Sequence, residues 1–214
     1  MNRAPPHPAP PLGPGALIGA LLLLLTGCAT PPHEPLPDSR EAAWEAHWER
    51  VLAVTDWELQ GRVAVRTEHD GGRVGMNWTQ QGESYELVLN GPFGSGEVTL
   101  TGDGGGAVLV GPGDEQGYYH PDAAVLLEAY TGYALPVKAL AYWVRGIPAP
   151  GRGREWALND HGRLEQLRQG PWTVTYEQYR EVDGAHLPVR LSAEGPGMRL
   201  RLAIHGWQRL ETDS

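Results

Sequence analysis

Residues that could carry chemistry are few in this chain and lie far apart. Cys28 is the only cysteine, so neither a Cys/His catalytic pair nor a thiolate metal site can be assembled. The eight histidines show no H-E-x-x-H or other ligand spacing. His120 and Asp122 flank Pro121 at the start of a predicted helix, where we expect them to serve capping rather than catalysis.

Two short strings resemble catalytic or cofactor motifs, and both fail on context. Ser95 lies between glycines, but Phe93 and Glu97 occupy the outer glycine positions of a nucleophile elbow. The string GDGGGA at 102–107 has dinucleotide-loop spacing, yet a strand rather than a helix is predicted to follow it. The sequence therefore predicts a binding protein and not an enzyme, with no cofactor and no metal.

The N-terminus has the pattern of an export signal. Ala16–Leu25 is a ten-residue apolar run that rises about 15 Å as a helix, half of what a bilayer core requires. It ends in Leu-Thr-Gly-Cys at 25–28, which looks like a bacterial lipobox. We therefore expect residues 1–27 to be a lipoprotein signal peptide and Cys28 to carry the acyl chains. The alternative is a plain secretory signal with a chance cysteine.

The remainder of the chain is predicted to be a Pro-rich tether and one domain. Residues 28–37 hold the lipidated Cys28 and an extended segment, and residues 38–214 are long enough for a single domain with a real core. The formal net charge of −9 argues against nucleic acid and against electrostatic adhesion to anionic lipid. Membrane contact is then expected from acyl chains and apolar groups.

Helical patterns occur in three places. Asp38 followed by Glu41 is typical of a capping box, and a helix is predicted from there to about Thr55. Residues 121–130 and 136–144 each begin with proline and stop before glycine. Both are apolar nearly all round, so we expect them to be covered.

Most of the chain alternates with a period of two, which is typical of strands with one apolar face. The predicted strands are 57–67, 74–79, 85–89, 98–101, 107–110, 116–119, one at Trp156, 164–168, 172–179, 188–193 and 198–205. An antiparallel sheet of about eleven strands with one apolar face should curl into a barrel or a deep half-barrel around an apolar cavity, with the apolar helices plugging its mouth. Ten inward side chains are candidates for the cavity wall or the lid contact: Leu59, Val63, Met76, Trp78, Leu87, Trp143, Trp172, Val174, Leu200 and Leu202. Some of them must be plain core, and the alternation does not separate the two groups.

Phe93 is the only phenylalanine of the chain and lies among turn-forming residues. Such a loop usually runs over the surface, so we expect the ring to face solvent. The alternative is that Phe93 folds back into the core.

Several separate segments carry a family resemblance. The lipobox, the strand WELQGRVAV at 57–65, the loop LNGPFG at 89–94 and the segment YWVRGIP at 142–148 resemble the LolB family of outer-membrane lipoprotein receptors, in the same order along the chain. The resemblance implies an eleven-stranded unclosed barrel with a helical lid. It also implies that an exposed apolar residue after the third strand, here Phe93, is needed for insertion into the membrane.

The same resemblance implies a role and its partners. A LolB-like protein accepts acylated lipoproteins from the periplasmic carrier LolA and inserts them into the inner leaflet of the outer membrane. Its partners would be LolA, the acyl chains of cargo and outer-membrane phospholipid. We expect a monomer anchored to the outer membrane through Cys28, with its domain facing the periplasm. The alternative is a periplasm-facing lipid-binding or structural envelope lipoprotein with no transfer role.

Overall fold

The computed structural model describes residues 39–91 and 96–209. The chain divides into two units, residues 1–36 and 37–214, and all that follows concerns the second. The predicted signal peptide, Cys28 and its tether, and Phe93 lie outside the described residues.

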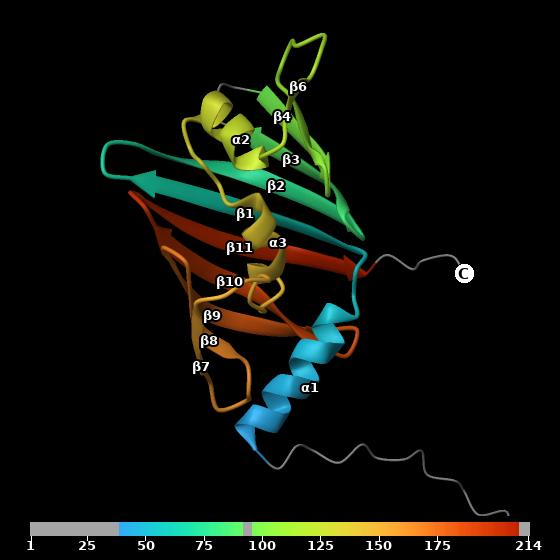
Figure 1. Ribbon diagram of the computed structural model, residues 1–214, viewed down its shortest axis with the longest axis vertical. Coiled ribbons are helices and arrows are strands. Elements are labelled where there is room, and N and C mark those ends of the chain that lie inside the picture. The colour runs from blue at the N-terminus through green and yellow to red at the C-terminus, as the bar shows by residue number, and fades with distance from the viewer. Residues whose placement is uncertain (1–38, 92–95, 210–214) are drawn as a thin grey trace, which may run out of the picture. The chain divides into compact units, whose positions relative to one another are not determined.

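A single antiparallel sheet of eleven strands forms most of the domain, and it runs in the order β6-β5-β4-β3-β2-β1-β11-β10-β9-β8-β7 (Figure 1). Because this order begins at β6 and ends at β7, the sheet is not closed, and the predicted fold class is confirmed. The strands are β1 (Trp57–Thr67), β2 (Gly71–Gln81), β3 (Ser84–Gly91), β4 (Gly96–Asp103), β5 (Gly106–Val110), β6 (Tyr118–His120), β7 (Arg154–Leu158), β8 (Leu164–Gln169), β9 (Trp172–Val182), β10 (Ala185–Gly195) and β11 (Met198–Arg209).

The alternation of the sequence becomes the two faces of this sheet. In the centre, Val63 of β1 pairs with Val74 of β2 on one side and with Leu202 of β11 on the other, and all three are buried. The residues that alternate with them along each strand point to the opposite face and are mostly polar. Burial of one face against the helices supplies the core.

Helix α1 (Arg40–Leu52) begins one residue later than the capping box suggested. Ser39 is the N-cap: it has an extended backbone, and its side chain accepts a hydrogen bond from the Ala42 amide at 3.1 Å. A hydroxyl at that position satisfies a free amide of the first turn, which decides where the helix starts. The helix ends at Leu52, short of the predicted Thr55. Trp44, His47 and Val51 are its buried residues.

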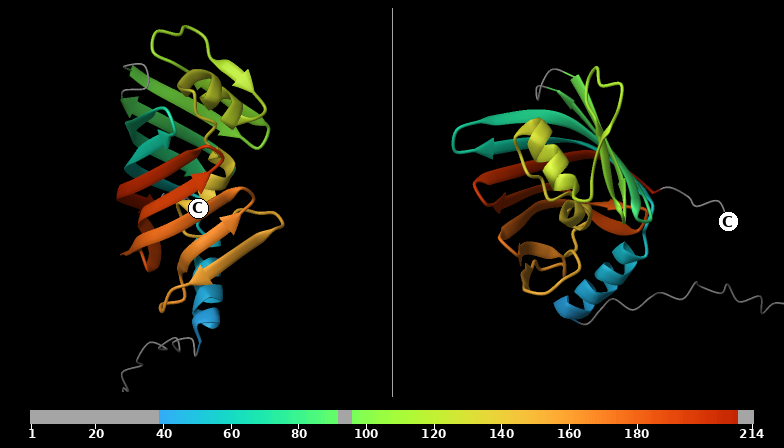
Figure 2. Two further views of the ribbon diagram at one scale, coloured as in Figure 1. Left: turned by 90° about the vertical axis from the view of Figure 1, so that its left-hand side faces the viewer. Right: turned by 45° about the horizontal axis from the view of Figure 1, so that its top comes forward.

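Helices α2 (Ala123–Thr131) and α3 (Val137–Trp143) lie on the same side of the sheet (Figure 2). Neither begins with proline, because Pro121 precedes the N-cap of α2 and Pro136 is itself the N-cap of α3. The expectation that both would be fully covered is wrong for α2. Its Val125 is 43 % exposed, since only one face of this helix contacts the sheet.

Candidate binding cavity

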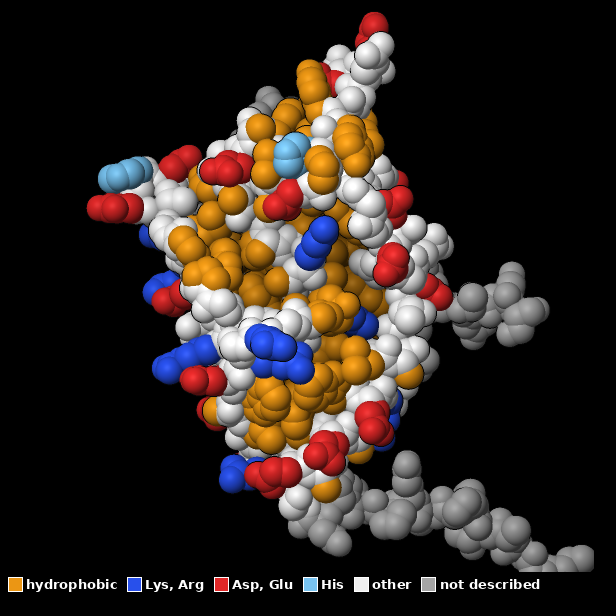
Figure 3. Space-filling model, in the orientation of Figure 1, with side chains coloured by type: hydrophobic (Ala, Val, Ile, Leu, Met, Phe, Trp, Pro, Cys, Tyr) orange, Lys and Arg blue, Asp and Glu red, His pale blue; other side chains and the backbone are white. Residues whose placement is uncertain are grey.

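A hollow of about 620 Å³ opens on the concave side of the sheet, within the size range of small-molecule pockets. It lies between α3, the β2–β3 and β4–β5 turns, the segment 149–152 and the start of β9. Figure 3 shows hydrophobic side chains gathered over this face of the molecule. The cavity is lined by Trp78, Gln80, Gly82, Glu83, Tyr85, Asp103, Gly104, Val137, Lys138, Ala139, Ala141, Tyr142, Trp143, Ala149, Pro150, Gly151, Arg152, Gln169, Gly170 and Trp172.

The wall on the β2 side consists of an indole whose polar atom is already bonded. Trp78 on β2 donates from Nε1 to Gln80 Oε1 at 3.1 Å, and Gln80 Nε2 donates to the Gly82 carbonyl at 2.9 Å. Trp78 and Gln80 are spaced two residues apart on one strand, so they share the concave face. Trp78 is only 1 % exposed, so this wall is a nearly buried indole whose hydrogen bonds stay inside the protein.

The opposite wall repeats this arrangement. Trp143 at the end of α3 donates from Nε1 to Gln169 Oε1 at 3.0 Å. Gln169, at the end of β8, also accepts from the Ala149 amide at 3.0 Å and donates to the Ala149 carbonyl at 2.7 Å. The side chain of Gln169 thus links α3, the segment that follows α3, and β8 by hydrogen bonds. Trp172 packs against Trp143, with ring centroids 5.8 Å apart.

Charged side chains stand only around the rim. Glu83, Asp103, Lys138 and Arg152 line the cavity but are all exposed. Tyr85 on β3 is partly buried beside Trp78, and burial, followed by the negative charge of Asp103, raises the pKa of its phenol to about 12. The phenol is therefore neutral at physiological pH, and the interior of the cavity offers an apolar ligand no charge to desolvate.

The ten predicted cavity residues occupy two kinds of position. Trp78, Trp143 and Trp172 line the cavity. The other seven are buried in the core and do not line it: Leu59, Val63, Met76, Leu87, Val174, Leu200 and Leu202. Sequence reasoning missed the contribution of α3 to the lining, which includes Val137, Ala139 and Ala141. Its signal was present, since small residues among large apolar ones on a short helix leave room beside it.

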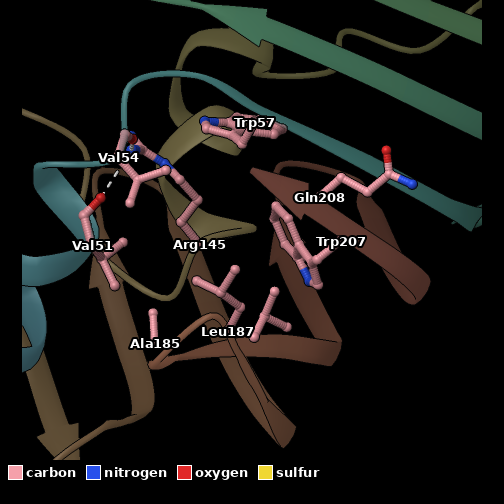
Figure 4. Close-up of a pocket in the computed structure, with 9 residues that line it drawn as sticks. Val51, Val54, Trp57, Arg145, Ala185, Leu187, Trp207 and Gln208 are labelled. Carbon is pink, nitrogen blue, oxygen red and sulfur yellow. Dashed lines mark hydrogen bonds between the residues drawn. The ribbon is translucent and has the colours of Figure 1, made fainter. Parts of the chain in front are cut away.

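A second hollow, of about 10 Å³, lies where the end of α1 meets the sheet (Figure 4). Arg145, only 8 % exposed, reaches into it between Trp57 and the last turn of α1. Its Nη1 donates to the Val51 and Val54 carbonyls at 3.4 and 2.9 Å, and its Nε donates to Ala141 O at 3.0 Å. Burial lowers the pKa of this guanidinium, but it remains charged. The negative end of α1 and the face of Trp57 stabilise that charge.

The sequence motifs that were set aside have structural roles. Asp122 Oδ1 accepts from the Ala124 amide at 3.0 Å, so it caps α2, and His120 Nδ1 accepts from the Asp122 amide. The string at 102–107 is the β4–β5 hairpin, where Asp103 Oδ1 accepts from the Gly105 amide. Within residues 39–91 and 96–209, no group of three or more His, Cys, Asp and Glu side chains is placed to hold a metal ion. Ser95 lies outside these ranges.

No helix in the described part of the chain is long and apolar enough to cross a membrane.

The fold defines a class of protein with known structures. A LolA superfamily protein from Nitrosomonas europaea has a similar fold, with a TM-score of 0.51 at 9 % identity over 83 % of this chain and 96 % of that one. At this identity the likeness concerns the fold alone.

Sequence comparison identifies the family within that class. The family model described as "Outer membrane lipoprotein LolB" matches residues 55–207. The outer-membrane lipoprotein LolB of Alkalilimnicola ehrlichii is 39 % identical over 89 % of this chain and 94 % of its own length. The LolB of Halorhodospira halophila is 38 % identical over 92 % of this chain and 96 % of its own. The chain belongs to the LolB family of outer-membrane lipoproteins.

Proposed function

We propose that this protein is an outer-membrane receptor that takes the acyl chains of lipoproteins from the periplasmic carrier LolA and releases them into the inner leaflet of the outer membrane. The observation that carries the proposal is the cavity of about 620 Å³, in whose wall the indole N–H groups of Trp78 and Trp143 are bonded within the protein. Such a wall favours an apolar ligand, because no unpaired donor at Trp78 or Trp143 has to be desolvated.

The cost of exposing acyl chains explains why a cavity is needed. Each buried CH₂ is worth about 0.8 kcal/mol, so a long chain costs roughly 10 kcal/mol in water. Passage through bulk water is therefore too slow, and the chains must move from one apolar cavity to another. An open sheet with a short helix across it provides an entrance that a closed barrel lacks.

The anchor and the loop complete the proposal. Cys28 would carry the acyl chains that hold the protein on the outer membrane, with the domain on the periplasmic side and acting as a monomer. Phe93 would make the first contact with lipid. Gly91 of β3 pairs with Gly96 of β4, so a β-hairpin flanks the four residues 92–95. Burying one ring is worth about 2–3 kcal/mol, enough to hold a loop in the interface briefly.

Brominated fatty acids test the cavity directly, because bromine quenches nearby tryptophan fluorescence. We expect saturable quenching in the wild type, and less of it in Trp172→Phe, which removes one emitter from the wall but keeps an apolar ring. Trp156→Phe, which changes an indole on β7 outside the cavity, should retain the quenching. An absence of saturable quenching would favour the alternative of a structural envelope lipoprotein with a filled core.

A further inference from the structure

Six arginines of β1, β2, β10 and β11 lie close together on the face of the sheet opposite to the helices. They lie in three cross-strand rows, and each row contributes two. Arg190 and Arg62 face each other across Ala203, Arg201 and Arg73 across Ala64, and Arg199 lies directly opposite Arg66. All six side chains are exposed.

Acidic side chains do not balance this array. Arg199 Nη2 lies 2.8 Å from Glu194 Oε1, and Glu194 belongs to the same row. Among the described residues no other arginine of the six forms an ion pair. The chain has a formal net charge of −9, so the array is a local reversal of the charge of the whole protein.

A hollow of about 480 Å³ lies within the array. Arg66, Arg73, Arg199 and Arg201 surround it, and the rest of its lining is Ala64, Val65, Gly71 and Gly72. Because most of these residues are small, the guanidinium groups surround an open depression. Four cations around a shallow depression form a receptor for an anionic group, and guanidinium binds phosphate oxygens in pairs.

Such an array lowers the stability of the free protein. Like charges directly opposite each other on neighbouring strands repel, and Arg66 and Arg199 are in that relation. An anion that occupies the hollow would remove the repulsion.

The array lies at the base of the β3–β4 hairpin. Thr67 pairs with Met198, so the β1–β2 and β10–β11 hairpins turn at the same end of the sheet (Figure 1). Gly91, the last residue of β3, approaches the same end: a Cβ on it would lie 3.3 Å from the Arg73 carbonyl. Strand β3, which leads toward Phe93, thus ends beside the array.

We propose that this arginine array (Arg62, Arg66, Arg73, Arg190, Arg199 and Arg201) docks on the phosphate groups of anionic phospholipids. The docking rests on the proposed function, since it orients the β3–β4 hairpin toward the leaflet that receives the cargo. A bilayer is favoured over an acidic protein because the array adjoins the hairpin assigned to lipid. The net charge of the chain argued against adhesion to anionic lipid. A net charge sums over all faces of the protein, so it does not show that arginines gather on one of them.

Hydrogen exchange of the full acylated chain in lipid nanodiscs tests the docking. The anchor holds the protein on every disc, so only the contact of the sheet varies. Phosphatidylglycerol in place of pure phosphatidylcholine is expected to slow exchange in the β1–β2 and β10–β11 hairpins. Raised salt should reverse this protection, since exposed charges are screened.

Variants of two arginines provide the comparison. Each basic side chain near an anionic leaflet raises the partition coefficient of a protein onto the membrane roughly fivefold. The double variant Arg73→Gln/Arg201→Gln should therefore weaken docking about 25-fold and abolish the protection. Arg40→Gln/Arg50→Gln removes the same charge from two exposed positions on α1 and should keep the protection. Melting temperatures of both variants show whether they fold.

Three results would overturn the docking proposal. One is equal exchange in neutral and anionic discs. Another is protection by inorganic phosphate with neutral discs, which would identify a phosphate site instead. The third is protection only when an acidic protein is added, which would make the partner a protein. Uptake of acyl chains is measured on the same samples: if it persists without protection, only the docking fails, and if it is lost in all discs, the proposed function fails.

Discussion

His47 shows how one buried side chain couples this fold to pH. It lies on α1 at 6 % exposure, and burial, with smaller contributions from Arg163, His186 and Arg50, lowers its pKa to about 4. A histidine whose folded pKa lies below its unfolded value of about 6.5 binds a proton more readily when unfolded. Stability is therefore full above pH 6.5 and is lost as the pH falls toward 4.

The free energy of unfolding should reflect this loss. Between pH 6.5 and 4, His47 is expected to account for a decrease of at most about 3 kcal/mol. Denaturant melts of His47→Phe should show a correspondingly flatter pH profile, and His69→Phe, which changes an exposed histidine, should follow the wild type. A His47→Phe profile as steep as that of the wild type would mean that other groups set the pH dependence.

Phe93 carries a separate prediction at the residue scale. If its ring faces water, Phe93→Glu should leave the melting temperature and the uptake of cargo from LolA nearly unchanged. Insertion into bilayers should fail, because a carboxylate resists entering the interface and the ring's 2–3 kcal/mol is lost. Phe93→Leu should retain most of the activity. A clear drop in melting temperature would make Phe93 a core residue, and normal insertion would assign membrane contact to another surface.

At the scale of elements, the sequence predicted strands far better than helix ends. Alternation over β1 and β2 is long and regular, so the side chains that face inward could be assigned directly from the sequence. The predicted start of α1 differs by one residue because Asp38 and Ser39 both have capping side chains, and the sequence alone does not choose between them. For α2, apolar composition overstated burial, since nothing in the sequence shows that Val125 points away from the sheet.

The contact of α1 with the β7–β8 turn can be tested with two glycines. Gly162 and Gly170 both have positive φ, +66° and +57°, so alanine strains the backbone at each. A Cβ at Gly162 would also lie 2.5 Å from the Ala43 Cβ and 2.6 Å from the Arg40 carbonyl, whereas at Gly170 it meets nothing within 4 Å. Gly162→Ala should therefore cost about 1–3 kcal/mol more than Gly170→Ala in denaturant unfolding. Equal costs would show that α1 can shift away from the turn.

At the scale of the whole molecule, the unclosed sheet and its family were predictable, and the membership of the cavity was not. Alternation identifies inward residues such as Leu59 and Trp78 alike. It does not show that Leu59 is buried in the core while Trp78 remains at a hollow beside α3. That distinction depends on where three helices cross eleven strands, which is a property of tertiary packing.

The cavity can be blocked from α3. Ala141 lines it and is half-buried, so Ala141→Trp fills space that an acyl chain would occupy. Ala46→Trp on the exposed side of α1 is the matched control. Melting temperatures of both variants show whether they fold.

Transfer of a lipoprotein from loaded LolA to this protein, measured before membranes are added, tests whether the cavity beside α3 holds the acyl chains. We predict that the wild type and Ala46→Trp accept the cargo, and that Ala141→Trp loses about tenfold or more of the uptake, as expected when about 1.4 kcal/mol of binding is removed. If folded Ala141→Trp takes up as much cargo as the wild type, the acyl chains occupy another site and the cavity is not the binding site.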